Sequence, residues 1–497
     1  MRLGFSGIFG EDMMSIAFPT PRPEVLAKRD TVIARLKQIV SGEGVITEEE
    51  ERRAFETDAL TAYRKVPMVV VLPETTEQVA EILAFCHQEG VPVVARGAGT
   101  SLAGGAIPQE DAVVLGVAKM NRVLDTNFAD RTMRVQAGIT NLAISGEVAH
   151  AGFFYAPDPS SQLACTIAGN VAMNSGGAHC LKYGVTANNI LGLRLVTVEG
   201  EIVDIGGEAL DSAGYDLIGL IVGSEGQLGV VTEVTVRILR AAEGARPVLF
   251  GFAEIAAAGR TVADIIGAGI IPVAIEYMDR QAIGICEAFA KAGYPLDVEA
   301  MLIIEVEGSD DEMDAMLARI VAIARNHGVT TIKESTSAME AAAIWKGRKS
   351  AFGATGRVAD YICMDGTIPT GRLPDVLEGI DRIVKGYGLR VANVFHAGDG
   401  NLHPLVMFNV NDPDEQIKAE RAGEDILRLC VEVGGCLTGE HGVGIEKRDL
   451  MRDQFNDTDL LQQTRIKSAF DPGWILNPAK VFPLDAPRDP LPAPRAA

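Results

Sequence analysis

Two histidines flank a glycine-rich turn in the last third of the chain: His396 precedes the turn and His403 follows it. Hydrophobic runs on both sides predict two strands, and the Gly-Asp-Gly-Asn sequence between them predicts an antiparallel hairpin. A turn centred on Asp399 and Gly400 would place His396 directly opposite His403, with both side chains on one face. Two imidazoles in that arrangement can bind one metal ion.

A carboxylate and a third imidazole lie further along the chain. Glu440 and His441 are neighbours in the segment 434–444, which has too many glycines for an ordinary strand. Two histidines and one carboxylate form a facial triad that leaves open positions for substrate oxygens. The sequence therefore predicts a divalent metal (Zn, Mn or Fe) on His396, His403 and Glu440. The alternative is that each histidine satisfies local hydrogen bonds.

A different chemistry is indicated earlier in the chain. An apolar strand over 67–72, a helix over 75–88 and a strand over 91–95 predict a βαβ unit, and the glycine-rich segment 96–105 follows directly. Glycines let backbone N–H groups approach an anion, and Thr and Ser hydroxyls add donors, so this loop predicts a phosphate cradle. It is not a Rossmann fingerprint, because Leu102 occupies the third glycine position. Taken alone, the loop is equally typical of a tight turn.

Three further segments, 157–161, 166–177 and 223–229, are also rich in glycine and other small residues. Small residues are needed where a ligand lies close against the backbone. Because these segments are spread over much of one domain, they indicate an extended cofactor that lies along it.

The totals exclude several classes of protein. A formal net charge of −22 argues against nucleic acid as a partner, because phosphates repel such a surface. The seven cysteines have no spacing that would hold an iron–sulfur cluster or structural zinc. Their odd number, without secretory features, favours the cytoplasm. No run is long and apolar enough to predict a transmembrane segment.

At 497 residues, two or more domains are expected. We expect an N-terminal extension with helices over 1–62, a cofactor domain over 63–241, a second domain over 242–484 and a flexible tail over 485–497.

Local signals predict the elements inside these parts. The apolar spacing over 23–40 predicts one helix, and Thr47 with Glu50 resembles a capping box that opens another. In the second domain, strands are expected over 247–252, 273–278 and 301–307, and helices over 253–266, 279–292 and 311–327. This alternation predicts a ferredoxin-like sheet with its helices on one side.

The order of the motifs resembles a known family. Arg-Gly-Ala-Gly-Thr-Ser from Arg96, Pro-Asp-Pro-Ser-Ser from Pro157 and the segments 166–177 and 223–233 resemble the FAD-binding domain of the vanillyl-alcohol-oxidase/PCMH flavoproteins. The motifs at 345–349, 364–366, 396–403, 439–442 and 477–480 are similar to the D-2-hydroxyacid dehydrogenase branch, which includes the FAD subunits of bacterial glycolate oxidases. The resemblance implies an α+β fold: a PCMH-type FAD-binding domain of two α+β subdomains, followed by a ferredoxin-like cap domain that supplies the substrate site.

The resemblance also implies how FAD is held. Binding is expected to be non-covalent, because Thr100 stands where relatives that tether FAD often carry His. The loop 96–101 would hold the pyrophosphate, and 157–161 with 166–177 would line the flavin and ribitol. Glu225 would lie near the adenosine, and Asn477 would close over the flavin. The expected FAD-binding residues are Arg96, Gly97, Ala98, Gly99, Thr100, Ser101, Gly104, Pro157, Asp158, Ser161, Thr166, Gly169, Asn170, Ser175, Gly176, Gly177, Glu225, Gly226, Val231 and Asn477.

The implied reaction is oxidation of a short 2-hydroxyacid to a 2-oxoacid by hydride transfer to flavin. His441 is the expected base for the hydroxyl proton. Arg348 is expected to bind the substrate carboxylate, with a solvated helix face as its alternative. Asn401 is expected to hydrogen-bond the substrate, although its place in a turn explains it equally well. Lys447 and Arg448 are expected to be surface charges.

One departure from the family bears on the substrate. Relatives that act on 2-hydroxyglutarate tend to carry a Lys where this chain has Cys363. Without that cation, glycolate or D-lactate is favoured over a dicarboxylate. The resemblance further implies a glycolate oxidase complex with another flavin-type subunit and an iron–sulfur subunit, peripheral at the inner membrane. The sequence leaves open whether the protein forms a homo-oligomer.

Three other functions stay open. One is a stand-alone D-lactate or D-2-hydroxyglutarate dehydrogenase. Another is a transferase like alkyl-dihydroxyacetone-phosphate synthase. The third is a scaffold subunit without catalysis, which the intact set His396, His403, Glu440 and His441 argues against.

Overall fold

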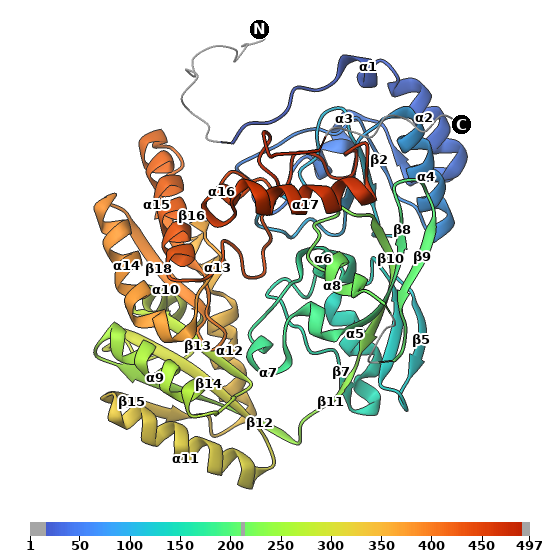
Figure 1. The fold of residues 1–497 in the computed structure, drawn as a ribbon. Helices are drawn as coiled ribbons and strands as arrows, with labels where there is room; N and C mark the ends of the chain where they lie inside the picture. Colours follow the sequence, from blue (N-terminus) through green and yellow to red (C-terminus); the bar gives the residue numbers. More distant parts are fainter. Residues whose placement is uncertain (1–15, 210–213, 490–497) are drawn as a thin grey trace.

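The computed structural model describes residues 16–209 and 214–489. Residues 1–15 of the expected N-terminal extension and residues 490–497 of the expected tail lie outside these residues. Figure 1 shows two bodies, one coloured blue to green from the first half of the chain and one coloured yellow to orange from the second half. The red C-terminal helices return to the first body. Among the described residues, none of the helices combines the length and hydropathy needed to cross a bilayer.

The first body contains a small, mostly parallel sheet of order β1-β2-β4-β3. Strands β2 and β4 are buried on both faces, as expected where a parallel sheet is covered on both sides, and this explains their runs of Val. Helix α4 connects β2 to β3, and its expected start is confirmed, because the Thr75 hydroxyl accepts the N–H of Gln78. The bounds are β1 (Val45–Ile46), β2 (Val69–Val71), α4 (Thr76–Glu89), β3 (Val93–Arg96) and β4 (Val113–Gly116).

Two expectations for the preceding helices are wrong. The helix predicted over 23–40 is two helices separated by a turn, α1 (Pro23–Leu26) and α2 (Arg29–Ile39). Thr47 does not cap α3 (Glu49–Arg52), because its hydroxyl lies against the side chain of the next residue instead.

The second sheet of the first body is antiparallel, with the order β5-β6-β10-β8-β9. Helix α6 packs on this sheet and begins at Thr166, whose hydroxyl accepts the N–H of Gly169. The helix ends at Asn174, which has the left-handed conformation typical of a helix end (φ 53°). The bounds are β5 (Val123–Asn127), β6 (Thr132–Gln136), α5 (Asn141–Val148), β7 (Phe153–Phe154), α6 (Ile167–Met173), α7 (Cys180–Tyr183), β8 (Ile190–Val196), β9 (Ile202–Gly206), α8 (Leu217–Ile221), β10 (Val230–Arg237) and β11 (Leu239–Arg240).

The second body is built on one antiparallel sheet. Its first four strands have the order β15-β12-β14-β13, the split βαβ arrangement of ferredoxin-like folds, and β18, β19 and β17 extend the sheet beyond β13. Strand β20 pairs with β18 and β16. The strands are β12 (Gly244–Phe252), β13 (Ala274–Asp279), β14 (Ala300–Gly308), β15 (Val329–Glu334), β16 (Asp360–Cys363), β17 (Gly366–Thr367), β18 (Arg390–His396), β19 (Asn401–Leu402) and β20 (Pro404–Phe408).

Helices cover both faces of this sheet, whereas the sequence predicted them on one side. Phe250 faces one layer of helices and its neighbour Leu249 faces the other. Successive strand residues point to opposite faces, so the continuous apolar runs of β12, β13 and β14 require two covers. The first cover contains α9 (Ile255–Gly267), α11 (Asp310–Asn326), α14 (Leu373–Gly386) and α15 (Pro413–Glu432); the second contains α10 (Arg280–Ala290), α12 (Ala338–Lys349) and α13 (Ala351–Thr355).

After α16 (Met451–Gln454) and α17 (Asp457–Phe470), the chain packs on the first body. Lys467 is buried, and its ammonium donates to the carbonyls of Gln227 and Leu476. These bonds fix Leu476 beside β3, where it forms a bridge to Val93. The neighbouring Asn477 is thereby held against the first body.

The described start of the expected flexible tail, residues 485–489, is tied to this C-terminal region. Asp485 pairs with Arg452 at 3.0 Å, and Asp489 pairs with Arg465 at 2.7 Å. These residues therefore pack against the helices rather than extend from them.

His179 joins the two bodies. Its Nδ1 lies 2.9 Å from Asp158 Oδ2 in the first body, and its Nε2 lies 3.0 Å from Glu305 Oε2 on β14 in the second. The indole of Trp345 donates to the other oxygen of Glu305. Burial of the ring opposes protonation, but the two carboxylates outweigh it and raise the pKa of His179 to about 10. The imidazolium is therefore an ionic bridge between the bodies.

This bridge predicts a pH dependence of stability. The folded pKa of His179 lies above its unfolded value, so its contribution is complete below about pH 6.5 and is lost as the pH rises towards 10. We expect the free energy of unfolding to fall by up to about 4–5 kcal/mol over this window, because one pKa unit corresponds to about 1.4 kcal/mol. Urea unfolding of the wild type and of His179→Gln measures the difference. His327→Gln, at the end of α11, is the control, and parallel pH profiles for wild type and His179→Gln contradict the assignment.

Candidate active site

His396 and His403 come from one hairpin, but the expected register is wrong. The residue opposite His396 is Asn401, and the carbonyl of His403 accepts the N–H of Val394. The loop is centred one residue earlier than predicted, because the carboxylate of Asp399 accepts the N–H of Asn401 and closes the turn there. The two histidines are diagonal neighbours on one face, with ring centroids 5.2 Å apart.

Glu440 meets both imidazoles from the loop that follows α15. Its Oε1 lies 3.4 Å from Nε2 of His396 and 3.2 Å from Nε2 of His403. Burial opposes ionisation of Glu440, but the two histidines hold its pKa well below the usual range. In the described part of the chain, neither ring nitrogen of buried His403 has a hydrogen-bond partner. Two imidazoles and a carboxylate with an orphaned nitrogen fit a divalent ion.

A second group that could hold an ion consists of Asp365, His403 and His441. Asp365 is already occupied by donors: the hydroxyl of Thr438 lies 2.5 Å away, and the backbone N–H groups of the next three residues lie 3.0–3.1 Å away. The ammonium of Lys447 lies at 3.4 Å. A carboxylate with this many donors has little capacity left for an ion, so the first group is the better metal site.

His441 lies beside these ligands on the wall of a cavity. Its ring stacks on that of His403, with centroids 4.9 Å apart and planes 4° from parallel. Burial lowers the pKa of His441 to about 4. The nearby charge of Asp365 raises this pKa, but the charges of His403 and Lys447 lower it further. The imidazole is therefore neutral at pH 7. Its Nδ1 is buried and has no hydrogen-bond partner among the described residues.

Arg348 does not line the cavity, contrary to its expected position on a substrate carboxylate. Its Nε and Nη2 lie 2.7 and 2.6 Å from Oε2 of Glu276, and the other oxygen of Glu276 lies 2.6 Å from Nδ1 of His396. Burial opposes ionisation of Glu276, but Arg348 and His396 hold its pKa below the usual range. Glu276 therefore orients His396 with Nε2 towards Glu440, as carboxylates orient metal-binding histidines.

Asn401 is also absent from the cavity wall. Its amide packs on Gly439, where a Cβ atom would collide with it. Its Oδ1 has no hydrogen-bond partner in the part of the chain that the structure describes. The side chain therefore supports the fit between the hairpin and the Glu440 loop.

Lys447 and Arg448 are buried, so their expected surface position is wrong. Lys447 lies 3.4 Å from Asp365 and 3.3 Å from Glu446. Arg448 donates to the carbonyl of Ala479. Asp365 and Ala479 are distant in sequence, so only the fold brings these two partners near the cations.

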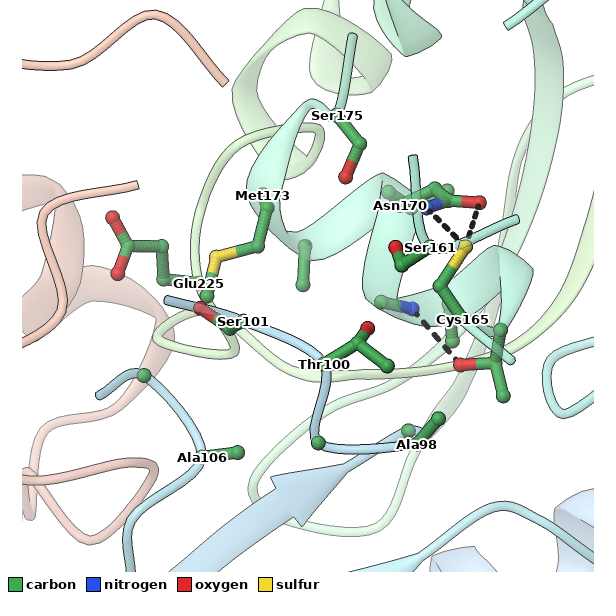
Figure 2. Close-up of a pocket in the computed structure, with 18 of the residues that line it drawn as sticks. Ala98, Thr100, Ser101, Ala106, Ser161, Cys165, Asn170, Met173, Ser175 and Glu225 are labelled. Carbon is green, nitrogen blue, oxygen red and sulfur yellow. Dashed lines mark hydrogen bonds between the residues drawn. The ribbon is translucent and has the colours of Figure 1, made fainter. Parts of the chain in front are cut away.

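The cavity has a volume of about 400 Å³, within the range of small-molecule sites. It is lined by the loop 95–102, by α6 and by His403, Glu440 and His441. Figure 2 shows side chains that line it, with Thr100 and Ser101 on one loop and Ser161, Asn170 and Ser175 on other segments.

Most of the residues expected to bind FAD line this cavity, but Gly104, Pro157, Asp158, Gly176 and Gly177 do not. Gly104 packs against Ile445, Asp158 pairs with His179, and Gly177 packs against Asp158. These positions serve packing between segments rather than the cavity wall.

The surroundings of the Arg96 guanidinium show whether the cavity fits the pyrophosphate of FAD. The residue is buried on the wall, yet its guanidinium has no ion pair among the described residues; it donates to the carbonyl of Thr57. Gly99, with φ 72°, leaves the room that the Arg96 side chain occupies. A buried cation without an anion, beside a glycine-rich loop, fits a pyrophosphate.

Sequence reasoning missed several residues of the site. Lys349, Phe352 and Tyr361 line the cavity from the second body, with the Phe352 ring 6.2 Å from that of His403. Their local sequence contains no signal for this position. The sequence did contain a signal for Glu276, because this residue is a charged residue inside the apolar run of β13.

Comparisons with known proteins agree with this fold. The family described as FAD binding domain matches residues 67–206, and the family described as FAD linked oxidases, C-terminal domain, matches residues 242–481. The structure of p-cresol methylhydroxylase with substrate bound has a TM-score of 0.77 at 14% identity and covers 92% of this chain and 98% of its own. Alkyldihydroxyacetonephosphate synthase has a TM-score of 0.70 at 19% identity, with 93% and 87% covered. At these identities the likeness supports the fold alone, and the expected PCMH-type α+β fold is confirmed. The fold and the two matches define an FAD-linked oxidoreductase.

Named relatives indicate which kind of FAD-linked oxidoreductase this chain resembles. The glycolate oxidase subunit GlcD of Escherichia coli K12 is 50% identical over 456 residues, 92% of this chain and 91% of the relative. GlcD of Bacillus subtilis is 38% identical over 437 residues (88% and 93%), and the D-lactate dehydrogenase of Archaeoglobus fulgidus is 31% identical over 436 residues (86% and 95%). The chain belongs to the family of FAD-linked oxidases that contains these GlcD subunits, as the motifs predicted.

The ion pair of Arg348 and Glu276 predicts a large loss of stability when one partner is removed. Arg348→Leu should lower the free energy of unfolding by about 3–5 kcal/mol, because buried Glu276 then loses its guanidinium partner and keeps only His396. Urea unfolding at pH 7 measures this loss, and adding Glu276→Gln should restore part of it. Arg280→Leu, which removes an exposed pair with Glu299, is the control and should cost under about 1 kcal/mol. A comparably small loss for Arg348→Leu contradicts the pairing.

Proposed function

We propose that this protein oxidises a short 2-hydroxyacid, glycolate or D-lactate, to the 2-oxoacid, with FAD as electron acceptor and a divalent ion (Zn, Mn or Fe) beside it. The observation that carries the proposal is the convergence of His396, His403 and Glu440, with His441 beside them, on a cavity walled by the FAD-binding segments. The family supports it, because its members include a glycolate oxidase subunit and D-lactate dehydrogenases.

FAD and the divalent ion would be held by different residues. Arg96 and the loop 97–101 would hold the pyrophosphate of FAD without a covalent bond, and α6 with Asn477 would lie along the rest of the cofactor. His396, His403 and Glu440 would hold the ion. When bound, FAD supplies a two-electron acceptor and the ion supplies a Lewis acid for the substrate oxygens.

The residues of this chain would orient the substrate and accept its proton. The neutral imidazole of His441 would take the proton of the α-hydroxyl, while the hydride of the α-carbon leaves towards the flavin. This removes one proton and one hydride from the alcohol and gives the ketone or aldehyde of the 2-oxoacid. Since Arg348 is engaged by Glu276, Lys349 on the wall is the cation placed to attract the substrate carboxylate.

The wall of the second body favours a monocarboxylate. Cys363 is buried and does not line the cavity, and Lys349 is the cation that this body contributes there among the described residues. Phe352 and Tyr361 beside it are aromatic. A second substrate carboxylate would therefore be desolvated without its own partner, which is costly.

Electrons would leave the flavin for another acceptor. All seven cysteines are free and dispersed in the structure, so the described chain offers no thiolate set for an iron–sulfur cluster. We propose that this chain is the catalytic subunit of a complex whose further flavin-type and iron–sulfur subunits accept the electrons, peripheral at the membrane. Dye reduction by the isolated chain would instead support a stand-alone dehydrogenase.

Anaerobic flavin reduction tests the proposed function. On mixing with glycolate or D-lactate, the flavin absorbance of the FAD-loaded protein near 450 nm should bleach. 2-Hydroxyglutarate should bleach it at least about tenfold more slowly, because its second carboxylate is buried without a partner, which costs about 1–3 kcal/mol or more. A chelator should slow the bleaching, and added Mn²⁺ or Zn²⁺ should restore it. Unchanged reduction after verified removal of the metal contradicts the role of the ion.

The role of His441 predicts a selective kinetic defect. His441→Asn should slow flavin reduction by about 10²–10⁴-fold, the range for loss of a general base, while metal content is retained. Stopped-flow absorbance gives the rate, and metal analysis gives the content. His150→Asn, just after α5 and not on the cavity wall, is the control. A rate within about threefold of the wild type would exclude His441 as the base.

A further inference from the structure

The segment that carries Glu440 and His441, residues 438–446, is held from two sides by two buried carboxylates. From the second body, Asp365 accepts the Thr438 hydroxyl and the N–H groups of residues 439–441. From the first body, Glu225 accepts the N–H of Val443 at 2.6 Å and of Gly444 at 2.8 Å. The 438–446 loop is therefore clamped between the two domains.

Glu225 belongs to the cavity as well as to this clamp. Residues 224–226 line the cavity, but the Glu225 carboxylate leaves the wall and reaches the 438–446 loop. Figure 2 shows it turned towards the salmon-coloured C-terminal part of the chain. Glu225 has φ 52°, an unusual value for a residue other than glycine, and Asn477 donates to its carbonyl at 2.7 Å. The conformation that sends the side chain away from the cavity is therefore fixed.

Packing around the contact leaves little freedom. A Cβ atom on Gly442 would lie 2.9 Å from both Glu225 Oε1 and the sulfur of Met173, another residue of the cavity wall. The N–H of Ile445 donates to the carbonyl of Ala103 at 2.9 Å, next to the phosphate-cradle loop. The 438–446 loop thus rests on the same segments that enclose the cavity.

We propose that Glu225 is a positioning residue that couples occupancy of the FAD cavity to metal binding on His396, His403 and Glu440. This inference rests on the proposed function. FAD in the cavity restricts residues 224–226, their carboxylate restricts the 438–446 loop, and the loop fixes Glu440 among the two histidines. Because coupling between two binding sites is reciprocal, the metal raises FAD affinity by the same factor.

Metal affinity with and without FAD tests the coupling directly. Isothermal titration with Mn²⁺ on the full chain, FAD-loaded and FAD-free, should give about tenfold or more tighter binding to the loaded wild type, within the usual range of coupling. Glu225→Gln should weaken Mn²⁺ binding to the loaded form by about 10–100-fold, the range for residues that orient metal ligands, and remove the difference between the forms. The amide explains this, because its NH₂ group cannot accept the second N–H.

Matched variants separate the outcomes. Glu233→Gln, a carboxylate on β10 that pairs with Arg134 and Arg194, should leave both affinities unchanged. His403→Ala should abolish Mn²⁺ binding; if the wild type binds none, the proposed metal site fails and the inference with it. If His403→Ala abolishes binding but the wild type shows equal affinity with and without FAD, the coupling alone is overturned. If Glu225→Gln binds Mn²⁺ as tightly as the wild type in both forms, the coupling is overturned as well. If that variant does not fold, the comparison of the two wild-type forms still decides.

Discussion

The buried carboxylate of Asp365 fixes the geometry on which the whole site depends. The loop that carries Glu440 and His441 has several glycines and no regular structure, so it has many conformations to lose. Asp365 collects one hydroxyl and three consecutive N–H groups from this loop, and Lys447 supplies a counter-charge. A buried carboxylate is costly without such partners, so its position and the loop conformation determine each other.

Around this anchor, positive and negative groups alternate through the interior. Arg348 faces Glu276, Glu276 faces His396, and Glu440 lies between His396 and His403. On the other side, Asp365 faces Lys447, which also faces Glu446. Each of these buried charges has an opposite neighbour, which is the condition for keeping charges in a core. At His396, His403 and Glu440, ligand atoms crowd and the nitrogens of the buried His403 ring lack hydrogen-bond partners among the described residues, so a divalent ion there would complete the pattern.

The fold class, and the types of residue proposed for the site, could be read from the sequence because both depend on local order. Histidines around a turn, glycine-rich loops and a capped helix such as α4 are visible in short windows. The hairpin register was missed because the turn was expected to be centred on Asp399 and Gly400. The Asp399 carboxylate instead accepts the N–H of Asn401 and shifts the centre of the turn by one residue. Burial of Lys447 and Arg448 was missed because Asp365 and the Ala479 carbonyl, which these cations reach in the interior, are distant in sequence. Arg348 was assigned to substrate because its partner Glu276 is 72 positions away on β13, and only the packing of the fold brings the α12 side chain to it.

We infer that His396, His403 and Glu440 bind one divalent ion beside the cavity proposed for FAD. Anomalous diffraction from crystals of the FAD-loaded protein, collected above and below the Zn or Mn absorption edge, tests it most directly. The account predicts one strong peak at about 2.0–2.2 Å from Nε2 of both histidines and from a Glu440 oxygen, with flavin density on the opposite wall. A peak on Asp365 and His441, or no peak in protein whose metal content is confirmed, would contradict it.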